Sequence, residues 1–339
     1  MIGKSPNSLT QLLTSVVISS RFIPVWIALG LLLVLAYLLA PGTLSAASFT
    51  AVLPLASFLA IVSLGQMLVV MTGGIDLSTP GVMTLAAFLT VGISAGANEN
   101  ILQGLAAALA ASALIGFANG FLIGVFRLNA LIVTLAIGQV TRGVLLRYAS
   151  QVANEASVPT GLSQWAISQV AGASWIFWIA ALTVIGVSVI LGYTGIGRRF
   201  RAVGANQIAA RISGLRVTLY VVMAYVAAAM LYGLAGFLLA AFIRSPTQGL
   251  GVPYLLGPIA AVVIGGASLS GGLASVLSTA LAAFFLTVLD QMLRVMGLPT
   301  SLQFVVFGVA IIGGMAVSGD RIVDMVESLF QRRFAKVQE

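Results

Sequence analysis

Blocks of about 20 apolar residues fill most of this chain, and short clusters of Gly, Pro and polar residues separate them. Two blocks, FIPVWIALGLLLVLAYLLA and LYVVMAYVAAAMLYGLAGFLLAAF, contain no charged residue. As a helix, about 20 such residues cross the hydrocarbon of a bilayer. The eighth block is short and ends in Gly, so we expect a broken or tilted helix there. The pattern predicts ten membrane-spanning helices, near residues 22–40, 49–72, 78–96, 101–125, 130–148, 173–193, 217–242, 254–267, 272–293 and 301–317.

The composition supports this pattern and excludes several other classes of protein. Hydrophobic residues make up 60% of the chain and charged residues 7%, whereas soluble domains carry roughly 25% charged residues. We therefore expect an all-α polytopic membrane protein. The chain has no Cys and no His, which excludes disulfides and thiolate metal sites and removes the commonest metal ligand. We expect no metal site.

The basic residues predict an orientation, because Lys and Arg are enriched in the cytoplasmic loops of membrane proteins. With the N-terminus inside, twelve basic residues face the cytoplasm, three face outward, and Arg142 lies within a span. This bias explains the net charge of +8, so the charge does not indicate that the protein binds nucleic acid. We expect a multi-pass protein with both termini cytoplasmic: an N-terminal segment (1–21), a transmembrane domain (22–317) with a cytoplasmic loop at 194–216, and a C-terminal tail (318–339).

Small residues recur at every fourth position of the span at 101–125. On a helix they share one face that is nearly free of side chains, which lets a neighbouring backbone approach closely. We interpret this stripe as a packing face; a lining of the substrate path is the alternative. Its members are Ala108, Ser112, Gly116, Gly120 and Gly124.

The loop between the sixth and seventh spans holds five of the sixteen basic residues: Arg198, Arg199, Arg201, Arg211 and Arg216. Within it, Asn206 is a good helix N-cap, the residues from Gln207 to Ser213 can form two turns, and Gly214 suits the end of a helix. Ile208 and Ile212 are four residues apart and would project from one side. A loop that only maintains topology explains the arginines but not these caps. We therefore interpret the segment as a short helix that docks on a partner or, as an alternative, on membrane lipid.

If ATP supplies the energy for transport, this chain cannot be the subunit that hydrolyses it. Its two lysines are Lys4 and Lys336, and neither belongs to a phosphate-binding loop of the type GxxxxGK(S/T). A separate subunit would have to hydrolyse ATP and act through a cytoplasmic contact, so we expect no catalytic residue here. An ion-coupled carrier is the alternative, but Asp76 and Asp290 are the only acids near or inside spans, and such carriers usually hold more.

Two segments place a Gly pair before a Leu-Ser pair: VVMTGGIDLS (69–78) and AVVIGGASLS (261–270). A Gly pair weakens a helix at membrane depth, and discontinuous helices often border the substrate path of transporters. We expect Asp76 and Ser78 to cap the third helix, and Ser268 or Ser270 to cap the ninth.

The translocation path has eight candidate residues, from the glycine motifs and from polar positions in other spans. For Asp76 the alternative is a buried cap that holds the turn, and for the amides it is hydrogen bonding between helices. The candidates are Gln66, Gly73, Gly74, Asp76, Ser78, Asn119, Gln139 and Ser268.

Four segments, in order over nearly the whole chain, closely resemble the permease subunits of bacterial ribose-type sugar ABC importers: GQMLVVMTGGIDLS, NGFLIGVFRLNALIVTLAIGQVTRG, GRRFRAVGANQIAARISGL and IAAVVIGGASLSGG. The resemblance implies a type II importer permease of ten helices in the bacterial inner membrane, paired with a second permease around a central path. It also implies a cytoplasmic ATPase pair that binds ATP and magnesium, and a periplasmic solute-binding protein. By motif, the segment 204–214 would be the coupling helix that docks on the ATPase, through Gly204, Asn206, Ala209, Ala210, Arg211, Ser213 and Gly214.

The chain departs from this family in two places. Thr79–Pro80–Gly81 follows the acidic motif where relatives often have Val-Gly, and residues 254–258 read YLLGP where relatives often carry Tyr-Glu-Leu-Asp. The loss of both acids in the second segment alters the outer mouth of the path. It leaves open which solute is carried and whether the permease forms a homodimer or a heterodimer. We expect import of a monosaccharide or similar small polar solute by alternating access; the alternatives are an ABC permease for an autoinducer or nucleoside, or an ion-coupled carrier.

Overall fold

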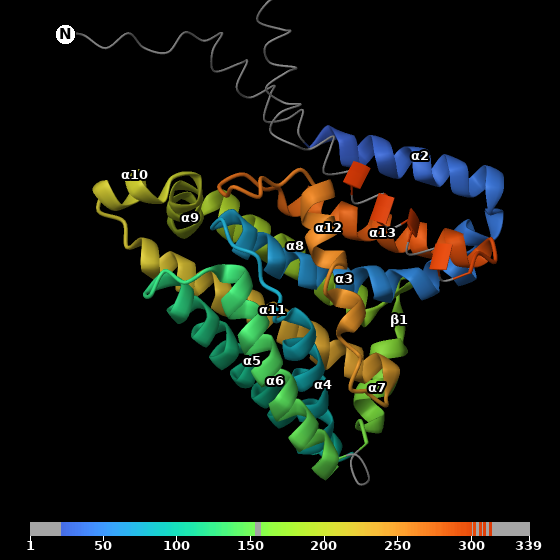
Figure 1. Ribbon diagram of the computed structural model, residues 1–339. Helices are drawn as coiled ribbons and strands as arrows, with labels where there is room; N and C mark the ends of the chain where they lie inside the picture. The colour runs from blue at the N-terminus through green and yellow to red at the C-terminus, as the bar shows by residue number, and fades with distance from the viewer. Residues whose placement is uncertain are drawn as a thin grey trace, which may run out of the picture.

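The computed structural model describes residues 22–152 and 157–299, together with 301–302, 305–306, 308–309 and 312–313. The described chain is a bundle of helices (Figure 1). They are α2 (Ile23–Leu39), α3 (Ala46–Met71), α4 (Thr79–Ser94), α5 (Ile101–Gly124), α6 (Ala130–Val152), α7 (Thr160–Ile167), α8 (Trp175–Tyr193), α9 (Gly195–Ala205), α10 (Gln207–Ile212), α11 (Val217–Ile243), α12 (Gly257–Ile264) and α13 (Val276–Val295).

A helix stands at each of the first nine expected spans, and the tenth falls mostly outside the described residues. Six helices in the described part are long and apolar enough to cross a membrane: α3, α5 with its preceding turn, α6, α8, α11 and α13. The α2 and α4 helices are shorter, with 17 and 16 residues. The multi-pass helical membrane protein is therefore confirmed. The expected break in the eighth span is also confirmed, because α12 has only eight residues.

Local structure between α6 and α8 differs from a purely helical chain. The helix α7 is followed by a two-stranded antiparallel hairpin, β1 (Gln169–Val170) and β2 (Ala173–Ser174). The turn residues Ala171 and Gly172 both have positive φ, +52° and +79°, which is typical of the tight two-residue turns that suit the twist of a hairpin.

The helix α3 runs through the centre of the molecule and packs on α11, α13, α12 and α8. Its side chains Phe58, Ile61 and Met67 are fully buried. Its backbone comes close to α11 at Gly65, where a Cβ atom would lie 2.6 Å from the Tyr232 ring and 3.0 Å from the carbonyl oxygen of Ala228. Glycine at this position lets the two central helices approach.

The stripe of small residues on α5 packs against α11, as expected. A Cβ atom at Gly116 would lie 2.5 Å from the carbonyl oxygen of Tyr225, and one at Gly120 would lie 2.7 Å from the Cα of Val222. The contact between α5 and α11 is the most extensive between two helices in the described residues. The packing interpretation is therefore confirmed.

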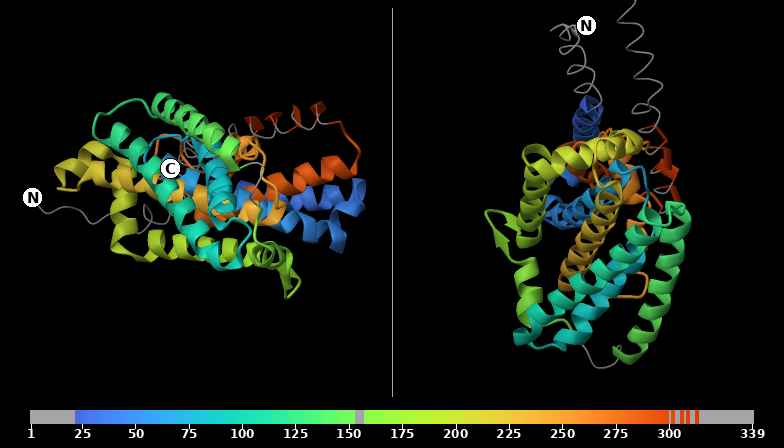
Figure 2. Two further views of the ribbon diagram at one scale, coloured as in Figure 1. Left: turned by 90° about the horizontal axis from the view of Figure 1, so that it is seen from below. Right: turned by 90° about the vertical axis from the view of Figure 1, so that its left-hand side faces the viewer.

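The connecting segments gather at two ends of the molecule. The helices α9 and α10 lie at one end, and α7 and the hairpin lie at the other (Figure 1). Seen from the first end, α9 and α10 form a cross-piece that joins α8 to α11 (Figure 2). The candidate site is built around this cross-piece.

Candidate functional site

The first glycine motif forms a turn that ends α3 and leads to α4; we call residues 72–78 the first glycine turn. The amide of Gly73 donates to the Val70 carbonyl (2.9 Å) and that of Gly74 to the Val69 carbonyl (3.3 Å). Gly73 has φ +82°. This is a Schellman motif, in which a glycine in the left-handed region satisfies the last carbonyls of a helix.

Asp76 fixes the shape of this turn from inside the protein. Its Oδ1 accepts hydrogen bonds from the Ser78 amide (2.8 Å) and the Ser78 hydroxyl (2.6 Å). The amide of Asn119, on α5, donates to the Ser78 hydroxyl over 2.9 Å. Asp76, Ser78 and Asn119 are all buried. The N-cap position of α4 is Ser78, but its side chain accepts no hydrogen bond from the helix. The expected cap on α4 is thus wrong in detail, because the carboxylate closes the turn ahead of the helix.

Gln66, on α3, holds the backbone of the same turn. With its amide oriented to satisfy both neighbours, Nε2 donates to the Asp76 carbonyl and to the Tyr232 hydroxyl, and Oε1 accepts from the Asp76 amide, each over 3.1 Å. Thr134 of α6 accepts from the Leu77 amide (3.0 Å). The turn is therefore bonded to α3, α5 and α6, and Gln66 links it indirectly to Tyr232 of α11.

Three polar atoms around the turn are buried without a partner among the described residues: Asp76 Oδ2, Asn119 Oδ1 and the Tyr225 hydroxyl. Buried polar atoms are nearly always hydrogen-bonded in folded proteins. These three atoms retain hydrogen-bonding capacity that the described residues do not use.

The second glycine motif forms a matching turn after α12; we call residues 265–275 the second glycine turn. Gly266, with φ +84°, donates to the Val263 carbonyl (2.9 Å), and Ala267 donates to the Val262 carbonyl (3.2 Å). The cap is the same Schellman motif. Gly266, rather than Gly265, is the counterpart of Gly73, so the two motifs correspond with a shift of one residue from the Leu-Ser alignment.

The serines of the second glycine turn do not cap the next helix. The hydroxyls of Ser268 and Ser270 lie 2.7 Å apart and bond to each other, whereas Ser275 is the N-cap of α13 and accepts from the Ser278 amide (3.3 Å). The expected cap by Ser268 or Ser270 is wrong because α13 begins several residues later than the apolar pattern indicates.

The segment 194–216, which we call the coupling loop, contains two helices, and the caps of the second are as expected. Asn206 Oδ1 accepts from the amides of Ile208 (3.0 Å) and Ala209 (2.9 Å). Gly214, with φ +80°, donates to the Arg211 carbonyl, and Leu215 donates to the Ala210 carbonyl, both over 3.0 Å. The preceding α9 was not expected; Phe200 and Val203 anchor it in the core.

The two isoleucines of α10 are largely exposed in the described part of the chain. Ile208 is 75% exposed and Ile212 is 83% exposed, while Ala210 is only 5% exposed. Ala209 is exposed beside them. The outer face of α10 is thus Ile208, Ala209 and Ile212, whereas Ala210 and Gly204 face the bundle and hold the helix in place.

The coupling loop and the two glycine turns meet at one junction of backbone atoms. The Gly272 amide donates to the Met71 carbonyl (2.9 Å), and a Cβ atom at Gly204 would overlap that same carbonyl oxygen. Gln207 Nε2 donates to the Thr72 carbonyl (3.0 Å). Together, α9 and α10 therefore contact the end of α3, the first glycine turn and the second glycine turn.

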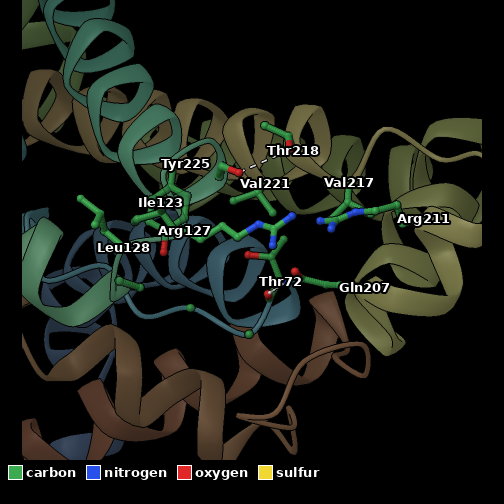
Figure 3. A pocket seen from close by; sticks show the side chains of 14 residues that line it. Thr72, Ile123, Arg127, Leu128, Gln207, Arg211, Val217, Thr218, Val221 and Tyr225 are labelled. Carbon is green, nitrogen blue, oxygen red and sulfur yellow. Dashed lines mark hydrogen bonds between the residues drawn. The ribbon is translucent and has the colours of Figure 1, made fainter.

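A cavity of about 270 Å³ opens between this junction and the connection from α5 to α6 (Figure 3). Gly73 and Gly74 form part of its wall, and Gly74 has no room for a Cβ because the Tyr225 hydroxyl lies against it. Arg127 and Arg211 reach into it from opposite sides (Figure 3).

The candidate path residues separate into three places. Gln66, Asp76, Ser78 and Asn119 form one buried network with Gly74 beside it. Ser268 lies in the second glycine turn. Gln139 is exposed on α6, apart from both.

Sequence reasoning missed the tyrosines Tyr225 and Tyr232 and the cavity residue Arg127. The two tyrosines are seven residues apart on α11, which places them on one face of a helix, and this spacing was the available signal. The sequence signal for Arg127 was weaker, because it is a single Arg in a short loop.

The chain resembles known transport proteins along most of its length. Residues 48–315 match the family model described as "Branched-chain amino acid transport system / permease component". The ribose import permease protein RbsC of Escherichia coli is 32% identical over 261 residues, which cover 75% of this chain and 80% of that protein. RbsC of Bacillus subtilis is 34% identical over 259 residues, 75% of this chain and 78% of the relative.

A relative named for a different solute is nearly as similar. The autoinducer 2 import system permease protein LsrC of Yersinia pseudotuberculosis is 29% identical over 269 residues, 79% of this chain and 76% of that protein. No solved structure gives a significant match. The span of the family match and the identity to the RbsC proteins together show that this chain belongs to this family of transport-system permeases.

Proposed function

We propose that this chain is the membrane-spanning subunit of an ATP-driven ABC importer that carries a monosaccharide or similar small polar solute into the cytoplasm. The observation that carries the proposal is the capped helix α10. Its outer isoleucines are largely exposed in the described part of the chain, Gln207 at its start is bonded to the Thr72 carbonyl of the first glycine turn, and Gly204 of the preceding α9 packs against Met71 and Gly272.

The exposed face of α10 suits a groove on a soluble partner. A helix that shows a few apolar anchors four residues apart commonly binds in this way. In the proposal the partner is a cytoplasmic ATPase that holds ATP and magnesium. Asn206, Ser213 and Gly214 shape the helix, Ala209 and Arg211 lie beside the contact, and Gly204 and Ala210 tie the helix to the bundle.

The junction at Met71 supports a mechanism of alternating access. When the ATPases close, they would displace α10, and the displacement would pass through Gly204 and Gln207 to the first glycine turn. Because packed interiors switch between arrangements rather than deform smoothly, the expected response is a shift of α3 and α12 against α4, α5 and α11. This chain itself carries out no covalent chemistry in the cycle.

The buried network is the proposed part of the translocation path. Asp76 Oδ2 and Asn119 Oδ1 are acceptors that have no donor among the described residues, and sugar hydroxyls are donors. A conformation that opens between α5 and the first glycine turn would present these atoms to the solute. Gln66, Ser78, Gly73, Gly74, Ser268 and Gln139 remain part of the proposed path.

The assembly follows the usual plan of a binding-protein-dependent importer. A second permease, either an identical copy or a paralogue, would complete the path, and a periplasmic solute-binding protein would deliver the solute. The proposed location is the bacterial inner membrane, with residues 1–21, the coupling loop and residues 318–339 in the cytoplasm.

The solute class rests on the relatives. Two of them are named for ribose and one for autoinducer 2, which favours a small, hydroxyl-rich solute. Import of autoinducer 2 is the second candidate, on the strength of the LsrC similarity.

Uptake by proteoliposomes tests the proposal. The chain would be reconstituted with the ATPase and binding protein from the same genome and offered labelled ribose or autoinducer 2. We expect uptake that needs ATP, stops with vanadate and survives a protonophore. Uptake that survives vanadate and collapses with the protonophore would show an ion-coupled carrier instead.

A further inference from the structure

Two arginine side chains face each other across the cavity next to α10. Arg127 comes from the connection between α5 and α6, Arg211 comes from α10, and both guanidinium groups extend into the same space (Figure 3). In the described residues neither side chain makes an ion pair or a hydrogen bond. Two cations that face each other repel unless an anion lies between them.

The cavity has no negative charge of its own within the described residues. The acids there are Asp76, Glu99 and Asp290, and none of the three lines it. Asp290 is paired with Arg294 on α13 over 2.9 Å. The positive charge of the cavity is therefore not compensated by the part of the chain that the structure describes.

The inner wall supplies an uncharged donor. Tyr225 lines the cavity beside Gly74, and its hydroxyl is buried against Gly74 with no hydrogen-bond partner among the described residues. Thr72 and Gln207 add polar groups, although both already bond to backbone carbonyls.

Arg127 also adopts a backbone conformation that is unusual for its residue type. Its φ is +56°, in the left-handed region that glycine or asparagine would occupy at lower cost. Such positions tend to persist where the side chain has a function.

We propose that this cavity binds the phosphate group of a small phosphate ester, held between Arg127 and Arg211 with the Tyr225 hydroxyl as a third donor. Arginine forks match the geometry of phosphate oxygens and bind them with charge-assisted hydrogen bonds. At about 270 Å³, the cavity is at the lower limit of small-molecule sites, so it admits a phosphate with a group no larger than a monosaccharide.

Binding would tie the coupling loop to the bundle. One ligand would bridge α10 and the turn after α5, and so oppose the movement of α10. This consequence for transport rests on the proposed function, whereas the binding itself does not. A phosphorylated sugar made from the imported solute, by the class of reaction that transfers a phosphoryl group to a hydroxyl, is the kind of ligand that would slow further import.

The test is phosphate binding to the purified chain in lipid nanodiscs, without ATPase. Radiolabelled inorganic phosphate and a pentose 5-phosphate would be measured by equilibrium dialysis, against chloride of equal ionic strength to remove general screening. We expect saturable binding of both, and no binding of the unphosphorylated pentose. Arg127→Gln and Arg211→Gln should each weaken it at least about tenfold, the usual effect of losing a charge-assisted bond. Tyr225→Phe should weaken it about threefold to tenfold.

Arg198→Gln is the matched control, because Arg198 is an exposed arginine on α9 that does not line the cavity. The affinity of this variant for phosphate should equal that of the parent.

Nanodiscs of phosphatidylcholine alone, compared with discs that contain phosphatidylglycerol, separate the two sources of the phosphate group. Equal affinity in both kinds of disc supports a free ester. Weaker phosphate binding in the discs with the anionic lipid supports a lipid headgroup in the same site. Binding no stronger than that of chloride, or equal binding by the Arg127→Gln and Arg198→Gln variants, would overturn the proposal. Failure of the ATPase to associate would not affect these results.

Discussion

The Gly272 amide donates a 2.9 Å hydrogen bond to the Met71 carbonyl, and this bond joins the second glycine turn to the end of α3, where the first glycine turn begins. Gly204 of the coupling loop packs on the same carbonyl oxygen. Three segments that are distant in the sequence thus meet at one backbone atom. In the proposed mechanism this atom is where force from the ATPase enters the bundle.

Gly204→Ala should disturb this junction. The added methyl group would overlap the Met71 carbonyl, and an overpacked contact of this kind costs about 1–3 kcal/mol. We expect a lower melting temperature in detergent and slower ATP-driven uptake. Gly192→Ala, in the last turn of α8, is the control, because a Cβ there meets nothing within 4 Å. Equal melting temperatures and uptake for the two variants would contradict the close packing at Gly204.

Asn206→Ala should loosen α10 without unfolding the bundle. The change removes the acceptor of two amide hydrogen bonds, and loss of an N-cap costs about 1 kcal/mol. Hydrogen exchange at Ile208 and Ala209 should become about fivefold faster, with no change in α3. Asn206→Asp keeps the acceptor and should exchange like the parent; equally fast exchange in both variants would show that the cap does not stabilise the helix.

Asp76→Ala should be more damaging than Asp76→Asn. Alanine leaves the buried Ser78 amide and hydroxyl without their acceptor, and each unsatisfied group costs about 1–3 kcal/mol. Asparagine keeps one amide oxygen that can accept these hydrogen bonds. The melting temperature measures the effect of each substitution on the stability of the fold, and uptake measures any further effect on transport. If Asp76→Asn keeps its stability but loses uptake, the carboxylate acts in the path; if both stay normal, Asp76 serves neither as a gate nor as a holder of the turn.

Gly116→Ala should separate α5 from α11. A Cβ there would lie 2.5 Å from the Tyr225 carbonyl oxygen, and close backbone contact is the main source of helix association in lipid. The expected loss is about 1–3 kcal/mol, seen as a lower melting temperature. Gly186→Ala on α8, where a Cβ meets nothing within 4 Å, should melt like the parent or slightly higher; identical behaviour of the Gly116 variant would rule out the tight α5–α11 interface.

Much of the fold follows from local patterns in the sequence. The apolar blocks located nine helices in the described residues, and the four-residue repeat on α5 identified the face that packs on α11. The caps of α10 were readable because Asn206 and Gly214 act within a few residues of their own positions. These features depend on short-range geometry, which the sequence shows directly.

The junction and the cavity depend on contacts that the sequence does not show. Gly204 meets Met71, and Arg127 faces Arg211, only because α3, α5 and α10 adopt one particular arrangement. The second glycine turn illustrates the same limit: the motif predicted a cap at Ser268 or Ser270, yet α13 begins after Ser275. A repeated motif indicated the turn but not where the next helix starts.

The position of Ile212 tests the central claim most directly, and the absence of native Cys makes single-site labelling simple. Ile212→Cys, at a side chain that is 83% exposed, would be treated with a membrane-impermeant maleimide, with Glu99→Cys as the control on the side expected to face outward. We predict that Ile212→Cys is labelled in inside-out vesicles, that it is not labelled in intact spheroplasts, and that bound ATPase protects it. Labelling of Ile212→Cys in spheroplasts, or equal labelling with and without the ATPase, would contradict the account.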